Sequence, residues 1–314
     1  ELSSVPGDYP VFENSAEGKS LVLNGDEWLD LNPVGIFGKS DPFSIGIRVW
    51  IPKELSEGVI FHKCIAERLY NYRGYHLYLK DNRLELSLAH SAPSNAITRI
   101  TSEPVPRNQW LQLLFTYDGS SRAEGLKLYL DGKELKLETA MDQLTKDIFI
   151  YSNQQPGLQI GAWNRGWGIK DGKVDDIFVY NRSLTELEVN IIAGKSEWTS
   201  IVSKQPDQLS AEEREALGDY YFSAVHPGVI VARNELKGLR SRLSDSTERI
   251  RELMVMQEMP EPRKAYILDR GNYDALGEEV FPTTPPSILP FPKELPKNRY
   301  GLALWLTSPD HPLT

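Results

Sequence analysis

Hydrophobic and polar side chains alternate through much of the chain between residues 21 and 180. The clearest case is the segment 43–51, where Phe43, Ile45, Ile47, Val49 and Ile51 are separated by small or polar residues. The same alternation recurs over residues 75–80, 83–88 and 111–117. Because successive side chains of a strand point to opposite faces, this pattern predicts strands with one buried face and one solvated face.

Turn residues separate these segments. Asp118-Gly119 follows one of them, and Asp131-Gly132 joins residues 126–130 to Leu135 and Leu137, where glycine accepts the positive φ of a tight hairpin turn. Many short strands with such turns, and no long helix among them, indicate an antiparallel β-sandwich of the jelly-roll type. We therefore predict a mainly β fold whose two sheets bury their facing sides.

The pattern changes to that of helices after residue 182. Ser183-Leu184-Thr185-Glu186 predicts a capping box before a helix that runs to Ile192, and Ser210-Ala211-Glu212-Glu213 predicts a second one. Further on, residues recur at heptad spacing in two series, Val229, Leu236, Leu243, Ile250 and Ala232, Leu239, Ser246, Leu253. We expect two antiparallel helices that pack on each other, with an intermolecular coiled coil as the alternative.

Residues beyond 254 are irregular and rich in proline. Within them, residues 263–280 fit a strand, a turn and a second strand, and residues 298–306 fit an apolar helix. We divide the chain into a sandwich at 1–198, a helical hairpin linker at 199–257 and the truncated start of a further domain at 258–314. Since the chain opens at Glu1 without a signal segment, we interpret it as a piece of a larger protein.

Composition excludes several classes of protein. The 314 residues are 40% hydrophobic and carry a net charge of −9, which fits a folded protein and argues against nucleic-acid binding. No apolar run approaches the roughly 18 residues of a membrane-spanning helix, so we predict no membrane insertion. Cys64 is the only cysteine, which excludes an internal disulfide, a thiolate zinc cluster and a haem-attachment motif within the chain.

Several segments together resemble the laminin-G-like, concanavalin A-like jelly roll. They are Leu21-Val22-Leu23-Asn24-Gly25, Trp110-Leu111-Gln112, Phe115-Thr116-Tyr117-Asp118-Gly119, Leu128-Tyr129-Leu130-Asp131-Gly132 and Gly172-Lys173-Val174-Asp175-Asp176-Ile177, in the order of that family. The resemblance covers residues 15–195. It implies a sandwich whose rim often holds a structural calcium ion.

In this resemblance Asp175 matches a carboxylate of the family's calcium site, while Asn24 replaces an acid before Gly25. We therefore expect a calcium site at Asn24, Gly25 and Asp175, because calcium prefers carboxylate, amide and carbonyl oxygens. The alternative is that Asn24 caps a turn and Asp175 accepts backbone hydrogen bonds.

Residues 250–314 resemble the domain of unknown function found in large planctomycete-type cytochrome c proteins. The matching segments are Arg270-Gly271-Asn272-Tyr273-Asp274, Gly277-Glu278-Glu279-Val280 and residues 298–306. In that family a laminin-G-like module is commonly inserted between uncharacterised domains. The resemblance implies a periplasmic or extracellular location in a bacterium, and we expect no haem in this chain because its attachment motif is absent.

The sequence offers no catalytic set. Glycosidases on such sandwiches need two carboxylates roughly 5–10 Å apart, and the adjacent Asp175 and Asp176 point to opposite faces of a strand. Motifs for a serine nucleophile, a phosphate loop or a zinc protease are absent. We therefore predict that the chain is not an enzyme. His62, His76 and His90 lie on neighbouring predicted strands, but isolated sheet histidines are commoner than a zinc site.

Two loops combine aromatic rings with amide and guanidinium groups. One carries Trp163, Asn164, Arg165 and Trp167 among glycines, and the other carries Tyr70, Tyr72 and Arg73. Rings that stack on a sugar, beside polar groups that bind its hydroxyls, suit carbohydrate recognition. The alternative is that these aromatics seal the sandwich rim or its contact with residues 200–314.

These observations predict a non-catalytic binding module, with a glycan or other domains of the parent protein as its partner. We expect the isolated chain to be monomeric. The competing interpretation is a structural spacer that binds no ligand, and a third is a glycoside hydrolase whose residues lie partly beyond Thr314.

Overall fold

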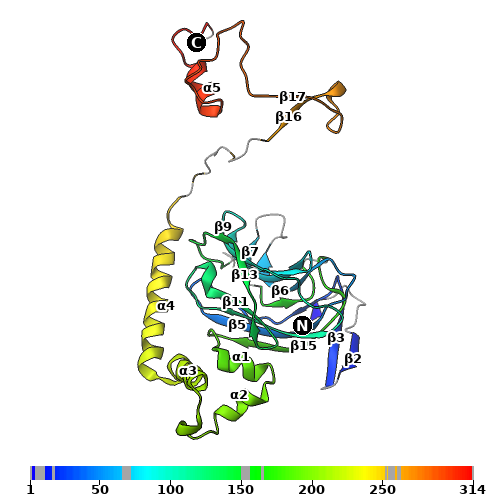
Figure 1. The fold of residues 1–314 in the computed structure, drawn as a ribbon, viewed down its shortest axis with the longest axis vertical. Coiled ribbons are helices and arrows are strands. Elements are labelled where there is room, and N and C mark those ends of the chain that lie inside the picture. The colour runs from blue at the N-terminus through cyan, green and yellow to red at the C-terminus, as the bar shows by residue number, and fades with distance from the viewer. Residues whose placement is uncertain are drawn as a thin grey trace. The chain divides into compact units, whose positions relative to one another are not determined.

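The computed structural model describes residues 2–3, 11–15, 18–65, 72–149, 156–163, 166–251, 253, 259 and 263–312. The chain divides into two compact units, Glu1–Ile250 and Arg251–Thr314 (Figure 1). In the part of the chain that is described, no helix is both long enough and apolar enough to cross a membrane.

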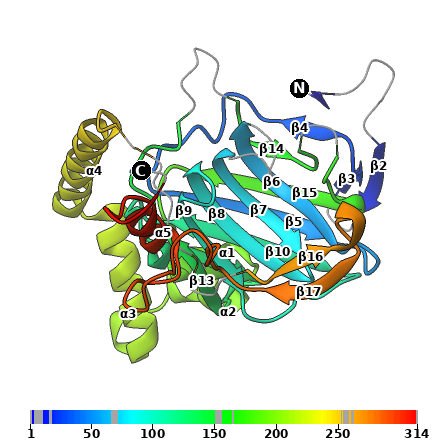
Figure 2. The ribbon, with the colours of Figure 1, turned by 90° about the horizontal axis from the view of Figure 1, so that it is seen from above.

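Two antiparallel sheets form a sandwich in the first unit, as the alternation predicts (Figure 2). The first sheet, in the order of its strands, comprises β1 (Leu2–Ser3), β4 (Trp28–Asp30), β14 (Gln159–Ile160), β6 (Glu57–Ile65), β7 (Arg73–Lys80), β8 (Arg83–Ser91), β9 (Asn95–Thr101) and β13 (Leu137–Asp142). The second sheet comprises β12 (Lys133–Glu134), β11 (Leu126–Leu130), β10 (Trp110–Tyr117), β5 (Phe43–Trp50), β15 (Lys170–Tyr180), β3 (Gly18–Asn24) and β2 (Val11–Ser15).

The alternating residues of both sheets meet in the core between them. Phe43 of β5 is fully buried, stacks on Phe37 at 4.5 Å and lies 5.6 Å from the ring of Phe115 in β10. From the first sheet, Leu77 and the ring of Tyr75 reach the same core. Each such side chain contributes about 1.5–3 kcal/mol by leaving water, so burial of the alternating residues stabilises the sandwich.

The predicted hairpin turn is present between β11 and β12. Asp131 and Gly132 have φ values of 49° and 82°, the left-handed conformation that a two-residue turn of this kind requires. The turn pairs Leu130 with Lys133.

Helices and helical turns follow the sandwich in the chain. They are α1 (Glu186–Ile192), α2 (Ser196–Ile201), the 3₁₀ turn η2 (Pro206–Gln208), α3 (Ala211–Tyr220), the π-helical turn η3 (Tyr221–Val225) and α4 (Pro227–Glu248), and a further 3₁₀ turn, η1 (Ala123–Gly125), precedes β11. Helix α1 packs on the outer side of the second sheet, where Leu184 and Val189 contact Leu114 and Tyr129.

The capping box predicted for the start of α3 is confirmed, whereas the one predicted for the start of α1 is shifted by two residues. Ser210 and Glu213 form the predicted capping box of α3. Helix α1 is capped by Thr185 and Glu188 instead of Ser183 and Glu186, because the buried Leu184 donates its N–H to Ser44 Oγ at 3.0 Å and continues the extended chain.

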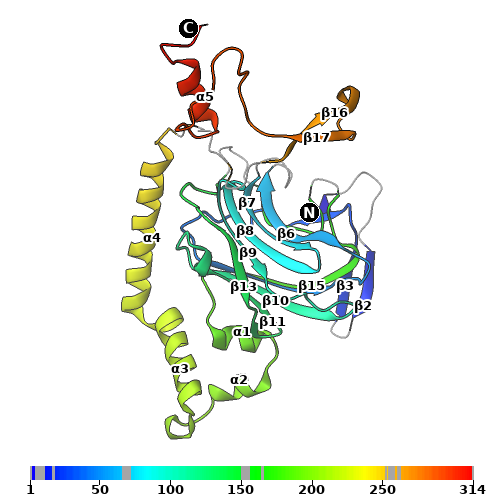
Figure 3. The same ribbon diagram turned by 45° about the horizontal axis from the view of Figure 1, so that its top comes forward.

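The long helix α4 lies alongside the sandwich (Figure 3). We expected the heptad residues to pack between two antiparallel helices, but Leu236, Leu239 and Leu243 are exposed on α4. Helix α3 packs instead through Ala216 on Leu187 of α1 and Ile201 of α2.

The second unit has the predicted order of elements. Strand β16 (Ala265–Leu268), the turn η4 (Asp269–Gly271) and strand β17 (Leu276–Val280) form an antiparallel pair, and α5 (Arg299–Leu306) follows. Asn298 caps α5 by accepting the N–H of Gly301 at 3.0 Å, and the buried Trp305 donates its indole N–H to Leu289 O at 3.0 Å. The domain boundaries at residues 198 and 257 remain predictions.

Candidate functional site

The loop with the two tryptophans joins β14 to β15, and we call residues 161–168 the tryptophan loop. Two backbone hydrogen bonds hold it. Val59 N of β6 donates to Trp167 O at 2.6 Å, and Ile169 N donates to Gly161 O at 3.1 Å, which joins the two ends of the loop. A Cβ on Gly168 would lie 2.4 Å from Gly161 O, so the close approach of these chains requires glycine. Asn164 and Arg165 lie outside the described residues.

Trp163 is a packing residue in this structure, with 1% of its surface exposed. Its ring stacks on His62 at 4.9 Å and 14°, lies 5.4 Å from His76, and meets the ring of Tyr72 edge-on at 5.5 Å. Trp163 and Tyr72 belong to a small apolar cluster on the outer side of the first sheet. The indole therefore closes this part of the sheet and leaves no open ring face for a ligand.

Trp167, in contrast, is 48% exposed. Its φ is 58°, a left-handed conformation that is uncommon for a bulky residue and persists only where the surroundings hold it. Here the carbonyl of Trp167 is held by Val59, and the next residue, Gly168, donates its N–H to Gly25 O at 3.2 Å. The loop thus presents one large apolar ring to solvent from a fixed backbone.

The second predicted loop is engaged in internal contacts. Tyr72 is buried, with its hydroxyl 2.7 Å from Ser87 Oγ. The guanidinium of Arg73 donates to His90 O at 3.0 Å and lies 2.9 Å from His90 Nε2. Tyr70 lies outside the described residues. The structure therefore brings Tyr72 and Trp163 together in a packed cluster. Both are buried, whereas Trp167 is exposed.

Beneath Trp163 the first sheet carries His62 and His76, which the sequence places on neighbouring strands, and beside them the acids Glu57 and Glu85, which the sequence pattern does not connect with them. His62 and His76 are cross-strand partners of β6 and β7, and His76 Nε2 lies 3.0 Å from Glu85 Oε1 on β8. Tyr78 donates its hydroxyl to Glu57 at 3.2 Å. Glu57 lies in β6 and Glu85 in β8, so the alternation of residues within a single strand does not predict that they lie close to the histidines. Among the described residues, no group of three His, Cys, Asp or Glu side chains is arranged to hold a metal ion.

Burial sets the protonation of this cluster. It lowers the pKa of His62 from 6.5 to about 3, since a buried imidazole resists a charge. The hydrogen bonds agree, because His62 Nδ1 accepts the N–H of Cys64 at 3.3 Å and Nε2 donates to Ala162 O at 3.1 Å. Burial also raises the pKa of the Cys64 thiol and lowers that of Lys63 to about 8. A protonated thiol of this kind is a poor nucleophile.

The residues expected to bind calcium do not come together. Val174 pairs with Leu21, so Asp175 lies about four residues, or about 13 Å, along the sheet from Asn24. Asn24 Oδ1 accepts the N–H groups of Asp26 and Glu27, both at 2.9 Å. Asp175 accepts the Ser15 hydroxyl at 3.1 Å and the N–H of Asp176 at 3.0 Å. Calcium binding by Asn24, Gly25 and Asp175 remains a prediction, and the side chains of Asn24 and Asp175 have local structural roles.

This geometry predicts that Asn24 stabilises its turn without calcium. Asn24→Ala removes an acceptor for two N–H groups, so we expect a loss of about 1 kcal/mol and a Tm lower by about 2–4 °C. Thermal unfolding in EDTA and in millimolar calcium should show the same loss, and Asn24→Asp, which keeps the acceptor, should show little. A loss that occurs only in calcium would contradict the turn role.

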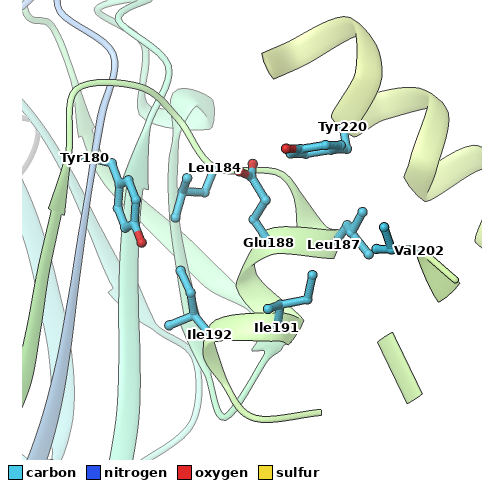
Figure 4. A pocket seen from close by; sticks show the side chains of 8 residues that line it. All are labelled: Tyr180, Leu184, Leu187, Glu188, Ile191, Ile192, Val202 and Tyr220. Atoms are coloured by element: carbon cyan, nitrogen blue, oxygen red, sulfur yellow. The ribbon is translucent and has the colours of Figure 1, made fainter. Parts of the chain in front are cut away.

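A hollow beside α1 has a volume of about 270 Å³ (Figure 4). Its lining is mostly apolar and consists of Tyr180, Leu184, Leu187, Glu188, Ile191, Ile192, Val202 and Tyr220. Glu188 binds both guanidinium nitrogens of Arg182 and accepts the N–H of Thr185 at 3.0 Å. Because these bonds occupy the carboxylate, the hollow has no free acid for a sugar and suits an apolar side chain better.

The comparisons with known proteins agree with the fold. A model of the concanavalin A-like lectin/glucanases superfamily, of the laminin-G type, matches residues 23–190. The chain belongs to this superfamily. Its name covers lectins and glucanases alike, so membership leaves the chemistry of this member to its own residues. The match ends before residue 250, and the resemblance of residues 250–314 to planctomycete-type cytochrome c proteins remains a prediction.

Solved structures that align with this laminin-G-like chain include two toxin domains. One is the binding domain of botulinum neurotoxin serotype G, with 16% identity, a TM-score of 0.45, and coverage of 62% of this chain and 46% of that one. The other is the binding domain of Paraclostridial Mosquitocidal Protein 1, with 18% identity, a TM-score of 0.47, and coverage of 62% and 47%. The chain spans less than half the length of either. No curated protein matches it.

Proposed function

We propose that the laminin-G-like sandwich is a non-catalytic module that binds glycans at the tryptophan loop through Trp167. The exposed indole on a constrained backbone is the observation that carries this proposal. An aromatic face is the usual platform for the apolar side of a sugar ring. A backbone that is already held at Trp167 and Gly168 spares the entropy of ordering it on binding.

The turn next to the loop supplies polar groups. Gly168 is hydrogen-bonded to Gly25, and the same turn carries the acidic residues Asp26 and Glu27. Carboxylates accept hydrogen bonds from sugar hydroxyls. A glycan stacked on Trp167 would thus have hydrogen-bond acceptors within the neighbouring turn. The acids Glu57 and Glu85 of the first sheet already accept hydrogen bonds from Tyr78 and His76.

The proposal predicts that Trp167→Ala loses glycan binding and keeps its stability. On a glycan array, the wild-type chain should bind a defined set of glycans, and the variant should bind them about tenfold more weakly or not at all, as when a central aromatic contact is removed. Its Tm should stay unchanged because the side chain is half exposed.

Phe222→Ala is the matched control, since Phe222 is 52% exposed on η3, away from the loop, and it should bind as the wild type does. Equal binding by Trp167→Ala, or a wild-type chain that binds no glycan, would disprove the proposal. The expected location in a bacterial periplasm or outside the cell, and the parent protein's other domains as partners, are further proposals from the family resemblance.

A further inference from the structure

Helix α4 contacts the sandwich through its polar face. Lys237 Nζ lies 2.6 Å from Asp41 Oδ1, Arg240 donates to Asp118 O at 3.3 Å, and Glu248 accepts the N–H of Asp147 at 2.6 Å. Ser244 lies on the same face and is buried. Charged and polar groups therefore fix the helix along the sandwich (Figure 3).

The apolar residues of α4 lie on a different face, and we call Leu236, Leu239, Leu243 and Ile250 the heptad stripe. The three leucines are 45%, 48% and 64% exposed, and Ile250 follows the helix end and is exposed too. At 100° per residue, the stripe is centred about 110° around the helix from the docked face. About two turns of apolar surface, from Leu236 to Leu243, thus lie to the side of the docked face and are open to solvent.

The spacing of the stripe matches one kind of partner. Apolar residues that repeat every 3.5 positions place a straight seam along a helix, which another helix of the same type fills with interlocking side chains. Such a seam differs from the broader apolar face with which a helix packs on a sheet. The docked face of α4 has no such repeat.

We propose that the heptad stripe pairs with the α4 helix of a second copy of this chain, in a parallel two-helix coiled coil. The charges beside the seam are self-complementary. Arg240 flanks the seam on the side of the sandwich, and Glu235 flanks it on the free side. In a parallel pair, the residue that flanks the seam at position i of one helix lies opposite position i+5 of the other helix. Glu235 of each copy therefore lies opposite Arg240 of the other copy, which gives two such pairs in the dimer.

Steric considerations favour the same orientation. A two-fold axis parallel to the helices places the two sandwiches on opposite sides of the helix pair. In an antiparallel pair both sandwiches would lie on one side, and Arg240 would face Arg233 of the other copy. Three heptads are few, so the dimer should dissociate on dilution.

Sedimentation equilibrium of the full 314-residue chain tests the pairing. In place of the monomer expected from the sequence, we expect a monomer–dimer equilibrium at micromolar concentrations. Leu239→Glu and Leu243→Glu should be monomeric with an unchanged Tm, because both side chains are exposed. A wild-type chain that stays monomeric up to high micromolar concentration would overturn the proposal and would leave the stripe to a different protein.

Charge reversal tests the partner's identity and orientation. Glu235→Arg should weaken the dimer several-fold, and the double variant Glu235→Arg/Arg240→Glu should restore it, because both contacts then exist with their signs exchanged. Because Arg240 also donates to Asp118 O in the sandwich, the Tm of the double variant is measured as well; failure to recover at a wild-type Tm would contradict parallel pairing.

Cross-linking gives an independent measurement. Cys64 is buried, so a cysteine introduced by Ser246→Cys, on the seam, is the accessible thiol. Mild oxidation should yield a covalent dimer, whereas Ser241→Cys, which lies outside the seam, should not. A dimer by mass in which Ser246→Cys fails to cross-link would place the interface elsewhere and reject this one.

Discussion

Replacing Trp163 with alanine is expected to lower the free energy of unfolding of the sandwich unit by about 3–5 kcal/mol, as for other fully buried tryptophans. The indole fills the space between His62, His76 and Tyr72, at ring distances of 4.9, 5.4 and 5.5 Å. Its removal leaves a cavity over polar groups that would then be exposed. For a unit of this size the loss corresponds to a fall in Tm of roughly 10 °C or more.

Chemical denaturation with urea measures this loss, and Trp167→Ala is the matched control because the same residue type is removed from the same loop. The control should unfold within about 0.5 kcal/mol of the wild type, as expected for an exposed side chain. Trp163→Phe should fall between the two. If Trp163→Ala and Trp167→Ala were equally stable, the packing role of Trp163 would be wrong.

Acid should destabilise the sandwich through His62. Its pKa is about 3 in the folded protein and 6.5 when unfolded, so the unfolded chain binds a proton between these values that the folded protein does not. Stability is then complete above pH 6.5 and falls by about 1.4 kcal/mol per pH unit as pH drops toward 3. Between about pH 7.5 and 5 the loss should reach about 2 kcal/mol, before most carboxylates titrate.

The measurement is the free energy of unfolding as a function of pH for the wild type and His62→Gln. The variant should be less stable at neutral pH, because it loses the stacking on Trp163, but its slope between about pH 7.5 and 5 should nearly vanish. His226→Asn is the control, since it keeps a capping side chain at the start of α4 and should retain the wild-type slope. A wild-type slope in His62→Gln would show that another group causes the acid sensitivity.

The sandwich could be predicted from the sequence because its signal is local. Phe43, Ile45 and Ile47 alternate within one strand, and Asp131-Gly132 defines a turn within two residues. The family match over residues 23–190 covers most of the region where this alternation occurs. The start of α1 was predicted two residues early, because the burial of Leu184 depends on Ser44, a residue 140 positions away.

The different environments of the two tryptophans could not be predicted. Trp163 and Trp167 stand four residues apart among glycines, and nothing local distinguishes them. Their different exposure depends on β6 and β7. These strands place His62 and His76 against the ring of Trp163, and the N–H of Val59 in β6 donates to the carbonyl of Trp167. Pairing of distant strands sets that difference, and a single sequence does not contain the register.

Helix α4 shows a second limit. The heptads at Leu236, Leu239 and Leu243 indicate a helical partner, and the neighbouring helix in the sequence is the simplest one. The sequence gives no sign that Lys237 and Arg240 contact the sandwich through Asp41 and Asp118, which lie more than a hundred residues earlier. Long-range polar contacts of this kind leave the heptads free for another partner.

The claim that Trp167 binds glycans while Trp163 packs the sandwich is tested most directly by ¹⁹F NMR of the chain labelled with 5-fluorotryptophan. Of the seven tryptophan signals, those of Trp163 and Trp167 are assigned by their absence in Trp163→Phe and Trp167→Phe. The tightest-binding glycan from the array is then titrated in. We expect the Trp167 signal to shift and to saturate with the glycan, while the Trp163 signal stays in place. A glycan that binds without moving the Trp167 signal, or that moves only the Trp163 signal, would contradict the account.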